Sequence, residues 1–129
     1  MKTVTDFLQV VLKQSYQALK KNEIPVGAII YDPKKMILIS QAHNKELSSM
    51  DPTSHAEILC IRKACKKLNQ KRLDGFTMIT YLEPCDMCKE AIKSARLSEV
   101  KFIFSNQNPS RKTIKKISYE KLALEEENL

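Results

Sequence analysis

Four residues have the types and the spacing of a hydrolytic zinc site. His55 and Glu57 lie two positions apart, and Cys85 and Cys88 follow further along the chain with two residues between them. Zinc binds imidazole nitrogen and thiolate sulfur, and a catalytic zinc site uses three protein ligands and leaves its fourth position to water. We therefore predict that His55, Cys85 and Cys88 bind one Zn²⁺ ion per chain.

Glu57 is the predicted catalytic residue, because it is close to His55 in the chain and is not needed as a metal ligand. Zinc lowers the pKa of a bound water to about 7. The Glu57 carboxylate could take a proton from that water and return protons to a ring nitrogen and to the departing ammonia. The predicted chemistry is therefore hydrolytic deamination of a ring carbon that bears an amine.

Each of these residues also has a simpler interpretation when it is taken alone. Ser54 and Glu57 fit a capping box, in which Glu57 would only satisfy a backbone N–H at a helix start. His55 could be an ordinary histidine at that start, and Cys85 with Cys88 could be a redox dithiol or part of a structural metal site. A structural site would normally add a fourth Cys or His, which we do not expect here. The remaining residues of these types are His43, Cys60 and Cys65.

The pattern of apolar residues predicts helices that alternate with short strands. The predicted helices are 5–20, 54–69 and about 84–95. The predicted strands are 26–31, 36–40, 76–82 and 100–104. This order implies a layered α/β domain whose helices cover a mixed sheet.

These elements place the predicted metal ligands at the starts of two helices. His55 falls in the first turn of one helix, and Cys85 and Cys88 fall in the first turn of the next, which Pro84 opens. Residues i and i+3 share a helix face, so both sulfurs can reach one ion. Helix N-termini carry partial positive charge and unpaired N–H groups, and both favour thiolate over thiol.

Length and composition restrict the class of protein. A chain of 129 residues suits one core, and we predict a single domain over 1–129. The two glycines exclude a Gly-rich phosphate loop, and no apolar run is long enough to span a bilayer. The N-terminus does not resemble a secretory signal, so we expect a cytoplasmic protein with no membrane partner. The formal net charge of +7 fits either an RNA partner or a solvated lysine surface.

The motifs His55-Ala56-Glu57 and Pro84-Cys85-Asp86-Met87-Cys88 resemble the signature of the zinc nucleobase deaminases in the cytidine deaminase superfamily. Within it, segments 25–28, 51–57 and 82–88 and residue Asn44 are most similar to the bacterial tRNA-specific adenosine deaminases. The resemblance implies a three-layer αβα sandwich with a central mixed sheet. It also implies that the two metal-bearing helices pack side by side on one sheet face.

The same resemblance implies a substrate and further site residues. The family converts the wobble adenosine of a tRNA anticodon loop to inosine, acts as a homodimer and binds a flipped-out base. By this resemblance Asn44 hydrogen-bonds the target base and Val26 helps to line its pocket. Ala56 and Pro84 are the other two residues assigned to substrate binding.

The resemblance covers residues 5 to 104. The family then usually has a Gly-containing segment, another strand and a longer C-terminal helix, whereas residues 105–112 contain no glycine. We expect 110–129 to form an atypical, shortened C-terminal end with a short helix over 119–127. Two alternatives stay open at this point. One is a deaminase of a free base or nucleoside, such as cytosine or guanine, and the other is a non-catalytic zinc-bearing RNA-binding protein.

Overall fold

Three helices and five strands make up the described part of the computed structural model, residues 2–106 and 117–122. The helices are α1 (Val4–Lys20), α2 (Ala56–Leu68) and α3 (Asp86–Ala95). The strands are β1 (Gly27–Asp32), β2 (Ile37–His43), β3 (Thr77–Leu82), β4 (Glu99–Phe104) and β5 (Ser118–Lys121). None of these described helices is both long and apolar enough to cross a membrane.

The five strands form one mixed sheet in the order β2-β1-β3-β4-β5. β1 pairs antiparallel with β2 and with β3, whereas β4 pairs in parallel with β3 and with β5. β1 and β2 are the expected hairpin, with one register shift between Ile30 and Tyr31. The mixed sheet predicted from the sequence is therefore confirmed.

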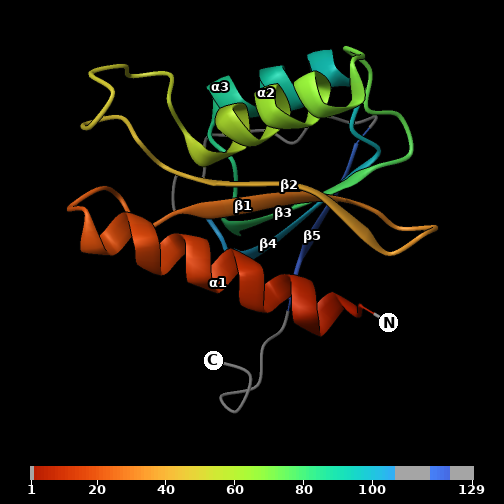
Figure 1. The fold of residues 1–129 in the computed structure, drawn as a ribbon, viewed down its shortest axis with the longest axis horizontal. Coiled ribbons are helices and arrows are strands. Elements are labelled where there is room, and N and C mark those ends of the chain that lie inside the picture. Colours follow the sequence, from red (N-terminus) through yellow and green to blue (C-terminus); the bar gives the residue numbers. More distant parts are fainter. Residues whose placement is uncertain (1, 107–116, 123–129) are drawn as a thin grey trace.

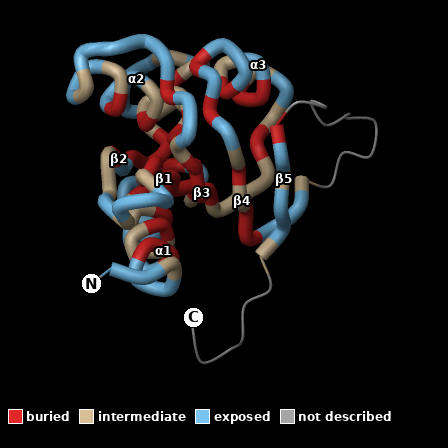
Figure 2. The backbone as a smooth tube through the Cα atoms, turned by 90° about the vertical axis from the view of Figure 1, so that its right-hand side faces the viewer, coloured by how far each residue is buried: buried red, intermediate tan, exposed pale blue. Residues whose placement is uncertain are grey.

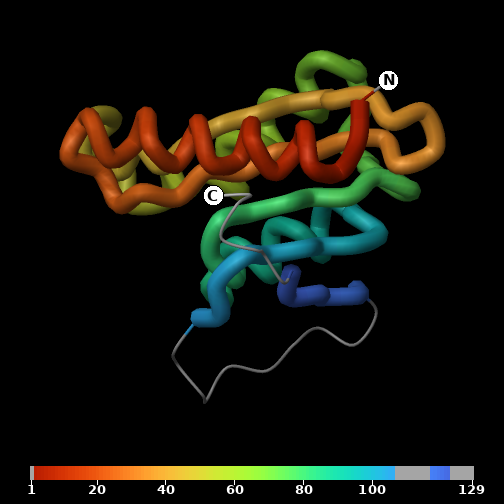
Figure 3. The backbone as a smooth tube through the Cα atoms, turned by 90° about the horizontal axis from the view of Figure 1, so that it is seen from below, coloured from red at the N-terminus to blue at the C-terminus, as the bar shows by residue number. Residues whose placement is uncertain are grey.

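Helices cover both faces of this sheet and produce three layers (Figure 1). α1 packs on one face against β1, β2 and β3, while α2 and α3 lie next to each other on the opposite face. Seen from below, α1 runs along the β1 and β2 side of the sheet, away from β5 (Figure 3). Buried segments concentrate in the sheet between the helical layers (Figure 2). This is the expected αβα sandwich, with both metal-bearing helices on one face.

α1 approaches the sheet closely because a glycine stands at the start of β1. Gly27 is buried, and a Cβ atom at this position would lie 2.6 Å from the carbonyl oxygen of Val11. The Ser15 hydroxyl accepts a hydrogen bond from the Gly27 N–H at 2.9 Å and donates one to the Val11 carbonyl at 2.8 Å. Helix and strand are therefore joined at the residue that follows Val26.

Small residues allow α2 to pack closely on the other face. Ala56, Cys60 and Ala64 are fully buried in the core beneath α2. The Ser40 hydroxyl of β2 donates a hydrogen bond to the Cys60 carbonyl at 2.9 Å. Cys60 is therefore a small residue of the core, whereas Cys65 is only partly buried.

The two helices next to the predicted metal ligands begin later than predicted. α2 starts directly after its N-cap His55, and α3 starts directly after its N-cap Cys85, so Pro84 precedes α3 instead of opening it. The His55 side chain makes no capping hydrogen bond, and Ser54 is not the N-cap. The alternative in which Ser54 and Glu57 form a capping box is therefore wrong.

The end of the described chain is a strand where the sequence predicted a helix. Residues 119–121 belong to β5, which pairs in parallel with β4 and places Tyr119 opposite Val100. Ile117 is buried, and Tyr119 packs against the core beneath α2. The strand is short and mostly exposed, so it carries no apolar alternation that a sequence pattern could reveal. The other residues of the predicted helix, and most of the C-terminal end over 110–129, lie outside the described residues.

Candidate metal centre and active site

The side chains of His55, Cys85 and Cys88 converge at the starts of α2 and α3. Their ligand atoms lie within 4.8 Å of one another. His55 Nδ1 is 3.6 Å from Cys85 Sγ and 3.5 Å from Cys88 Sγ. Zinc bonds of about 2.0–2.1 Å to nitrogen and about 2.3 Å to sulfur, at a tetrahedral angle, would separate these atoms by about 3.5 Å. The three side chains therefore fit a Zn²⁺ ion.

The positions of the ligands on their helices leave the side chains available for a metal. As N-cap residues, His55 and Cys85 already use their carbonyl groups, which accept hydrogen bonds from Leu59 N–H at 3.0 Å and Lys89 N–H at 2.8 Å. Their side chains are not engaged in capping. Cys88 lies three residues after Cys85, so its sulfur is on the same side of the helix start.

The two cysteines have opposite pKa shifts because they hydrogen-bond to each other. Hydrogen bonding from the Cys88 thiol, followed by the Cys88 backbone N–H and His55, lowers the pKa of Cys85 to about 5 against the effect of burial. The pKa of Cys88 is raised, first by that same hydrogen bond and then by burial and by Glu57. Cys85 is therefore the readier thiolate, which is the form that binds zinc.

Glu57 lies in the first turn of α2 and is almost completely buried. Burial raises the pKa of its carboxyl to about 7, while a hydrogen bond from its own backbone N–H and the charge of His55 act in the opposite direction. Its side chain also hydrogen-bonds with Cys88. A carboxyl with a pKa near neutrality can both accept and donate a proton, as a general acid–base requires.

A pocket of about 120 Å³ opens beside the metal ligands. It is lined by Ile24, Val26, Asn44, Glu46, His55, Glu57, Leu82, Glu83, Cys85 and Asn106. The predicted catalytic residue and two of the three predicted ligands therefore face one cavity together with Val26 and Asn44. The segments that carry Val26 and Asn44 are held together, since Asn44 N–H donates to the Val26 carbonyl at 3.0 Å.

Two predicted substrate-binding residues are not among those that line the pocket. Ala56 is fully buried in the core cluster beneath α2, and Pro84 is buried immediately before α3. Their contribution to substrate binding stays a prediction.

Two acidic residues of the pocket were not predicted from the sequence. Glu46, in the loop after β2, contacts Nε2 of His55 with its carboxylate. Glu83, directly after β3, accepts a hydrogen bond from Asn106 N–H at 3.1 Å and pairs with Lys89 Nζ at 3.3 Å. Glu83 lies within the matched segment 82–88, which was a signal for it, whereas no motif contains Glu46.

The remaining Cys and His side chains do not complete a structural four-ligand site. The Nδ1 atom of His43 lies 2.8 Å from Gln14 Oε1. The thiol of Cys60 interacts with the Ala28 carbonyl at 3.6 Å, in the core. Within the described residues, His55, Cys85 and Cys88 form the one cluster able to hold a metal, as a catalytic site requires.

Comparison with known proteins identifies the family. Residues 1–104 match the family model of the cytidine and deoxycytidylate deaminase zinc-binding region. The chain therefore belongs to this family of zinc-binding deaminases. The matched region contains the three candidate ligands as well as Glu57.

Individual relatives resemble the chain over most of its length. The tRNA-specific adenosine deaminase of Aquifex aeolicus (strain VF5) is 46% identical over 96 residues, which cover 74% of this chain and 62% of that protein. A structure from a study of A-to-I editing by tRNA:A34 deaminases has a TM-score of 0.79 at 28% identity and covers 90% of this chain and 92% of that chain. Guanine deaminase from Bacillus subtilis has a TM-score of 0.74 at 35% identity, covering 81% and 66%. The chain thus spans less than two thirds of the length of the Aquifex relative.

Proposed function

We propose that this protein is a zinc-dependent hydrolytic deaminase that converts adenosine to inosine at the wobble position of tRNA. The observation that carries the proposal is the convergence of three candidate zinc ligands, two of which line one pocket together with a buried glutamate. The Aquifex relative, named tRNA-specific adenosine deaminase, and the structure from the tRNA:A34 deaminase study support this substrate.

Hydrolytic deamination gives a role to each of the three candidate ligands and to Glu57. His55, Cys85 and Cys88 would hold one Zn²⁺ ion, which as a Lewis acid makes water a better nucleophile. Glu57 takes a proton from the attacking water and delivers protons to the ring nitrogen and to the leaving amine. In the balanced reaction the water oxygen bonds to C6 of adenine, the bond between C6 and the amine breaks, and ammonia leaves.

We assign binding of the base to two other residues that line the pocket. We assign Asn44 as its hydrogen-bonding partner and Val26 as an apolar surface against it, because both line the pocket. Ala56 and Pro84, as neighbours of Glu57 and Cys85 in the chain, would act by shaping the backbone around them. An unpaired anticodon loop suits this mode, because little unstacking energy is needed to extrude its base.

The proposed assembly is a homodimer of one deaminase domain per chain. The outer side of α2 and α3 has a shallow groove with Ile58, Ile61 and Ala91 among its lining, and this supports an interface there. Sedimentation at about twice 14.8 kDa is the expected result. We place the protein in the cytoplasm, where its tRNA substrate occurs and where thiolate ligands stay reduced.

The test is deamination by purified, zinc-analysed protein on an anticodon stem-loop with adenosine at the wobble position. Free guanine, cytosine, adenine and cytidine are assayed alongside. Glu57→Gln removes the carboxylate and keeps its size, and Glu90→Gln, on an exposed position of α3, is the matched control. We expect inosine with the wild type and with Glu90→Gln. Glu57→Gln should bind zinc and lose at least about 100-fold in turnover.

A free-base deaminase is the second candidate, because the guanine deaminase structure shares 35% identity with the chain. Ammonia released only from guanine or another free base would replace the tRNA proposal with this one. RNA binding and bound zinc without turnover on any substrate would instead indicate a non-catalytic zinc-bearing RNA-binding protein.

A further inference from the structure

The His55 ring is contacted on both of its nitrogen atoms. Nδ1 faces the sulfurs of Cys85 and Cys88, whereas Nε2 is paired with the Glu46 carboxylate. The pair is mostly shielded from water, since the side chains of His55 and Glu46 are 25% and 28% exposed. A carboxylate therefore stands behind the metal ligand, on the side away from the two cysteines.

Local hydrogen bonds fix the position of Glu46 in its loop. The Glu46 N–H donates to Asn44 Oδ1 at 2.8 Å, and the Glu46 carbonyl accepts from Asp51 N–H at 3.1 Å. The loop is closed where Lys45 N–H donates to the Ser54 carbonyl at 3.0 Å, directly before His55. A backbone hydrogen bond therefore links the residue before Glu46 to the residue before His55.

A second carboxylate anchors the same loop from the other side. Glu23 is buried, and its two carboxylate oxygens accept hydrogen bonds from Leu47 N–H at 2.9 Å and Ser48 N–H at 2.8 Å. The loop that presents Glu46 is therefore held at several points, so the contact with His55 costs little additional backbone freedom.

The contact can determine which nitrogen of the His55 ring carries the proton. A neutral histidine that binds a metal through Nδ1 carries its proton on Nε2, which is then a donor. A carboxylate that accepts from this N–H fixes the tautomer and the ring orientation and makes the ligand more basic. Such outer partners typically contribute about 10–100-fold to metal affinity.

We propose that Glu46 is the positioning residue of the metal centre, holding His55 with its proton on Nε2 and its Nδ1 directed at zinc. The inference rests on the proposed zinc site and adds a fourth side chain to it. It also links metal binding to base binding, because Asn44 accepts the Glu46 N–H with one end of its amide and lines the substrate pocket.

The first measurement is the zinc affinity of the folded, full-length protein by competition with a chromogenic chelator. Glu46→Ala should bind zinc about 10–100-fold more weakly than the wild type. Glu46→Gln should fall between the two, because its amide oxygen still accepts a hydrogen bond but carries no charge. Glu90→Gln is the control and should keep the wild-type affinity. Far-UV circular dichroism confirms that each variant is folded.

The second measurement reports on the His55 ring directly. The chain contains two histidines, so ¹⁵N-labelled protein gives only two sets of ring signals, and His43 serves as an internal reference. In the zinc-loaded wild type, two-bond ¹H–¹⁵N correlations should show His55 protonated on Nε2, with slow exchange of that proton. Glu46→Ala should accelerate the exchange and leave the His43 signals unchanged.

The outcomes separate this inference from the proposed function. Equal zinc affinity of wild type and Glu46→Ala, or a change confined to KM for the substrate, would overturn the positioning role and make Glu46 a pocket residue. A wild type that binds no zinc would overturn both proposals. Weaker zinc binding by Glu46→Ala in a protein that deaminates nothing would support the positioning role and reject the proposed function.

Discussion

Glu57 and Glu83 are carboxylates of the same pocket in different electrostatic surroundings. Burial raises the pKa of Glu57 to about 7, whereas Glu83 faces the ammonium group of Lys89 at 3.3 Å and the N–H of Asn106 at 3.1 Å. Environments that differ in this way let two identical side chains take separate roles. Glu57 is suited to exchange protons, whereas Glu83 is held in the pocket wall by Lys89 and Asn106.

Replacement of Lys89 tests the structural side of this division. Lys89 is 2% exposed, and Lys89→Met keeps the length of the side chain but removes the partner of Glu83. Loss of one member of a buried ion pair costs about 3–5 kcal/mol, and we expect the lower end because the Glu83 side chain is 18% exposed. Urea unfolding of the wild type and the variant measures the loss.

A double variant separates charge from packing. Glu83→Gln combined with Lys89→Met removes both charges, so part of the lost stability should return. If the double variant is as unstable as the sum of the two single variants, Lys89 acts through its packing and the ion pair has no coupling energy.

His43 should make folding stability depend on pH. Its ring is buried, and burial, followed by the charges of Lys21, Lys45 and Lys63, lowers its pKa against the opposing charge of Glu23. As pH falls below the unfolded value of about 6.5, the unfolded chain therefore binds this proton before the folded protein does. The contribution of His43 to folding stability is fully present above that value. It decreases as pH falls from the unfolded pKa towards the lower pKa of the folded protein.

The measurement for His43 is a difference between two proteins. Unfolding free energies of the wild type and of His43→Gln are compared at pH 7.5 and pH 5.5, and the zinc ligands titrate equally in both. The wild type should lose more stability on acidification than the variant. Equal losses would show that the His43 proton is not linked to folding.

The sequence was informative about residues that do chemistry and uninformative about residues that support them. His55, Glu57, Cys85 and Cys88 could be found because zinc chemistry restricts residue type and spacing at once. Glu46 reaches His55 only through the path of a loop, and a loop of that length does not reveal which of its side chains points inward. The contact therefore had to come from the three-dimensional structure.

At the scale of elements, the contact between α1 and β1 leaves no room for a side chain. The Cβ atom of Gly27→Ala would lie 2.6 Å from the Val11 carbonyl and 2.7 Å from the Ser15 nitrogen, so the backbone of α1 would have to shift. Overpacking of this kind costs about 1–3 kcal/mol or more, and we expect the upper end. Chemical denaturation of the variant measures the loss.

The other glycine of the chain provides the control. Gly75 has φ +86°, and a Cβ atom at this position would meet no neighbouring atom within 4 Å, so its replacement is opposed only by a backbone preference. Asparagine tolerates positive φ, and Gly75→Asn should cost below about 1 kcal/mol. A loss for Gly27→Ala no larger than this would show that α1 moves away from the sheet easily.

Elements with a strong apolar pattern were predictable, and elements defined by long-range pairing were less so. The helix predicted over 5–20 is α1 with one residue added at its start, because an amphipathic stripe extends along it. The predicted starts of α2 and α3 were too early in the chain. His55 and Cys85 are the N-cap residues, and neither makes the side-chain capping bond that a sequence pattern would reveal. β5 was missed because a short exposed strand depends on its pairing with β4.

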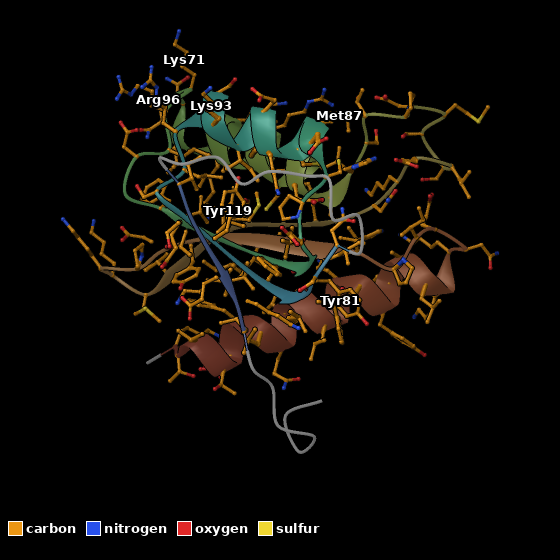
Figure 4. All side chains as sticks on the ribbon, turned by 180° about the vertical axis from the view of Figure 1, so that it is seen from behind. Lys71, Tyr81, Met87, Lys93, Arg96 and Tyr119 are labelled. Atoms are coloured by element: carbon orange, nitrogen blue, oxygen red, sulfur yellow. The ribbon has the colours of Figure 1, made fainter. Side chains whose placement is uncertain are left out.

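At the scale of the whole molecule, one cluster of positive charge lies apart from the metal site. Seen from behind, Lys71, Lys93 and Arg96 gather at one end of the α2 and α3 layer, while Met87, between the two ligand cysteines, lies at the other (Figure 4). Lys93 and Arg96 line an open cavity together with Arg72. A polyanion that reaches the pocket can therefore meet cationic surface well away from the reacting base.

RNA binding by this surface should depend strongly on salt. With a net charge of +7, affinity for the anticodon stem-loop should fall steeply between about 50 and 200 mM KCl, by about 0.7 log units per log unit of salt for each single-strand phosphate contacted. Fluorescence anisotropy of a labelled stem-loop gives this slope. Deamination of a free nucleoside, if the protein carries it out, should not show this salt dependence. A salt-independent affinity would indicate that the lysines are only solvated.

The position of the metal ligands along the chain also sets an order of events during synthesis. His55, Cys85 and Cys88 precede β4 and β5, so the ribosome, at about 5–20 residues per second, completes the ligand set before it makes the parallel half of the sheet. Once these residues have left the ribosome, zinc bound by His55, Cys85 and Cys88 would protect the two thiols from oxidation.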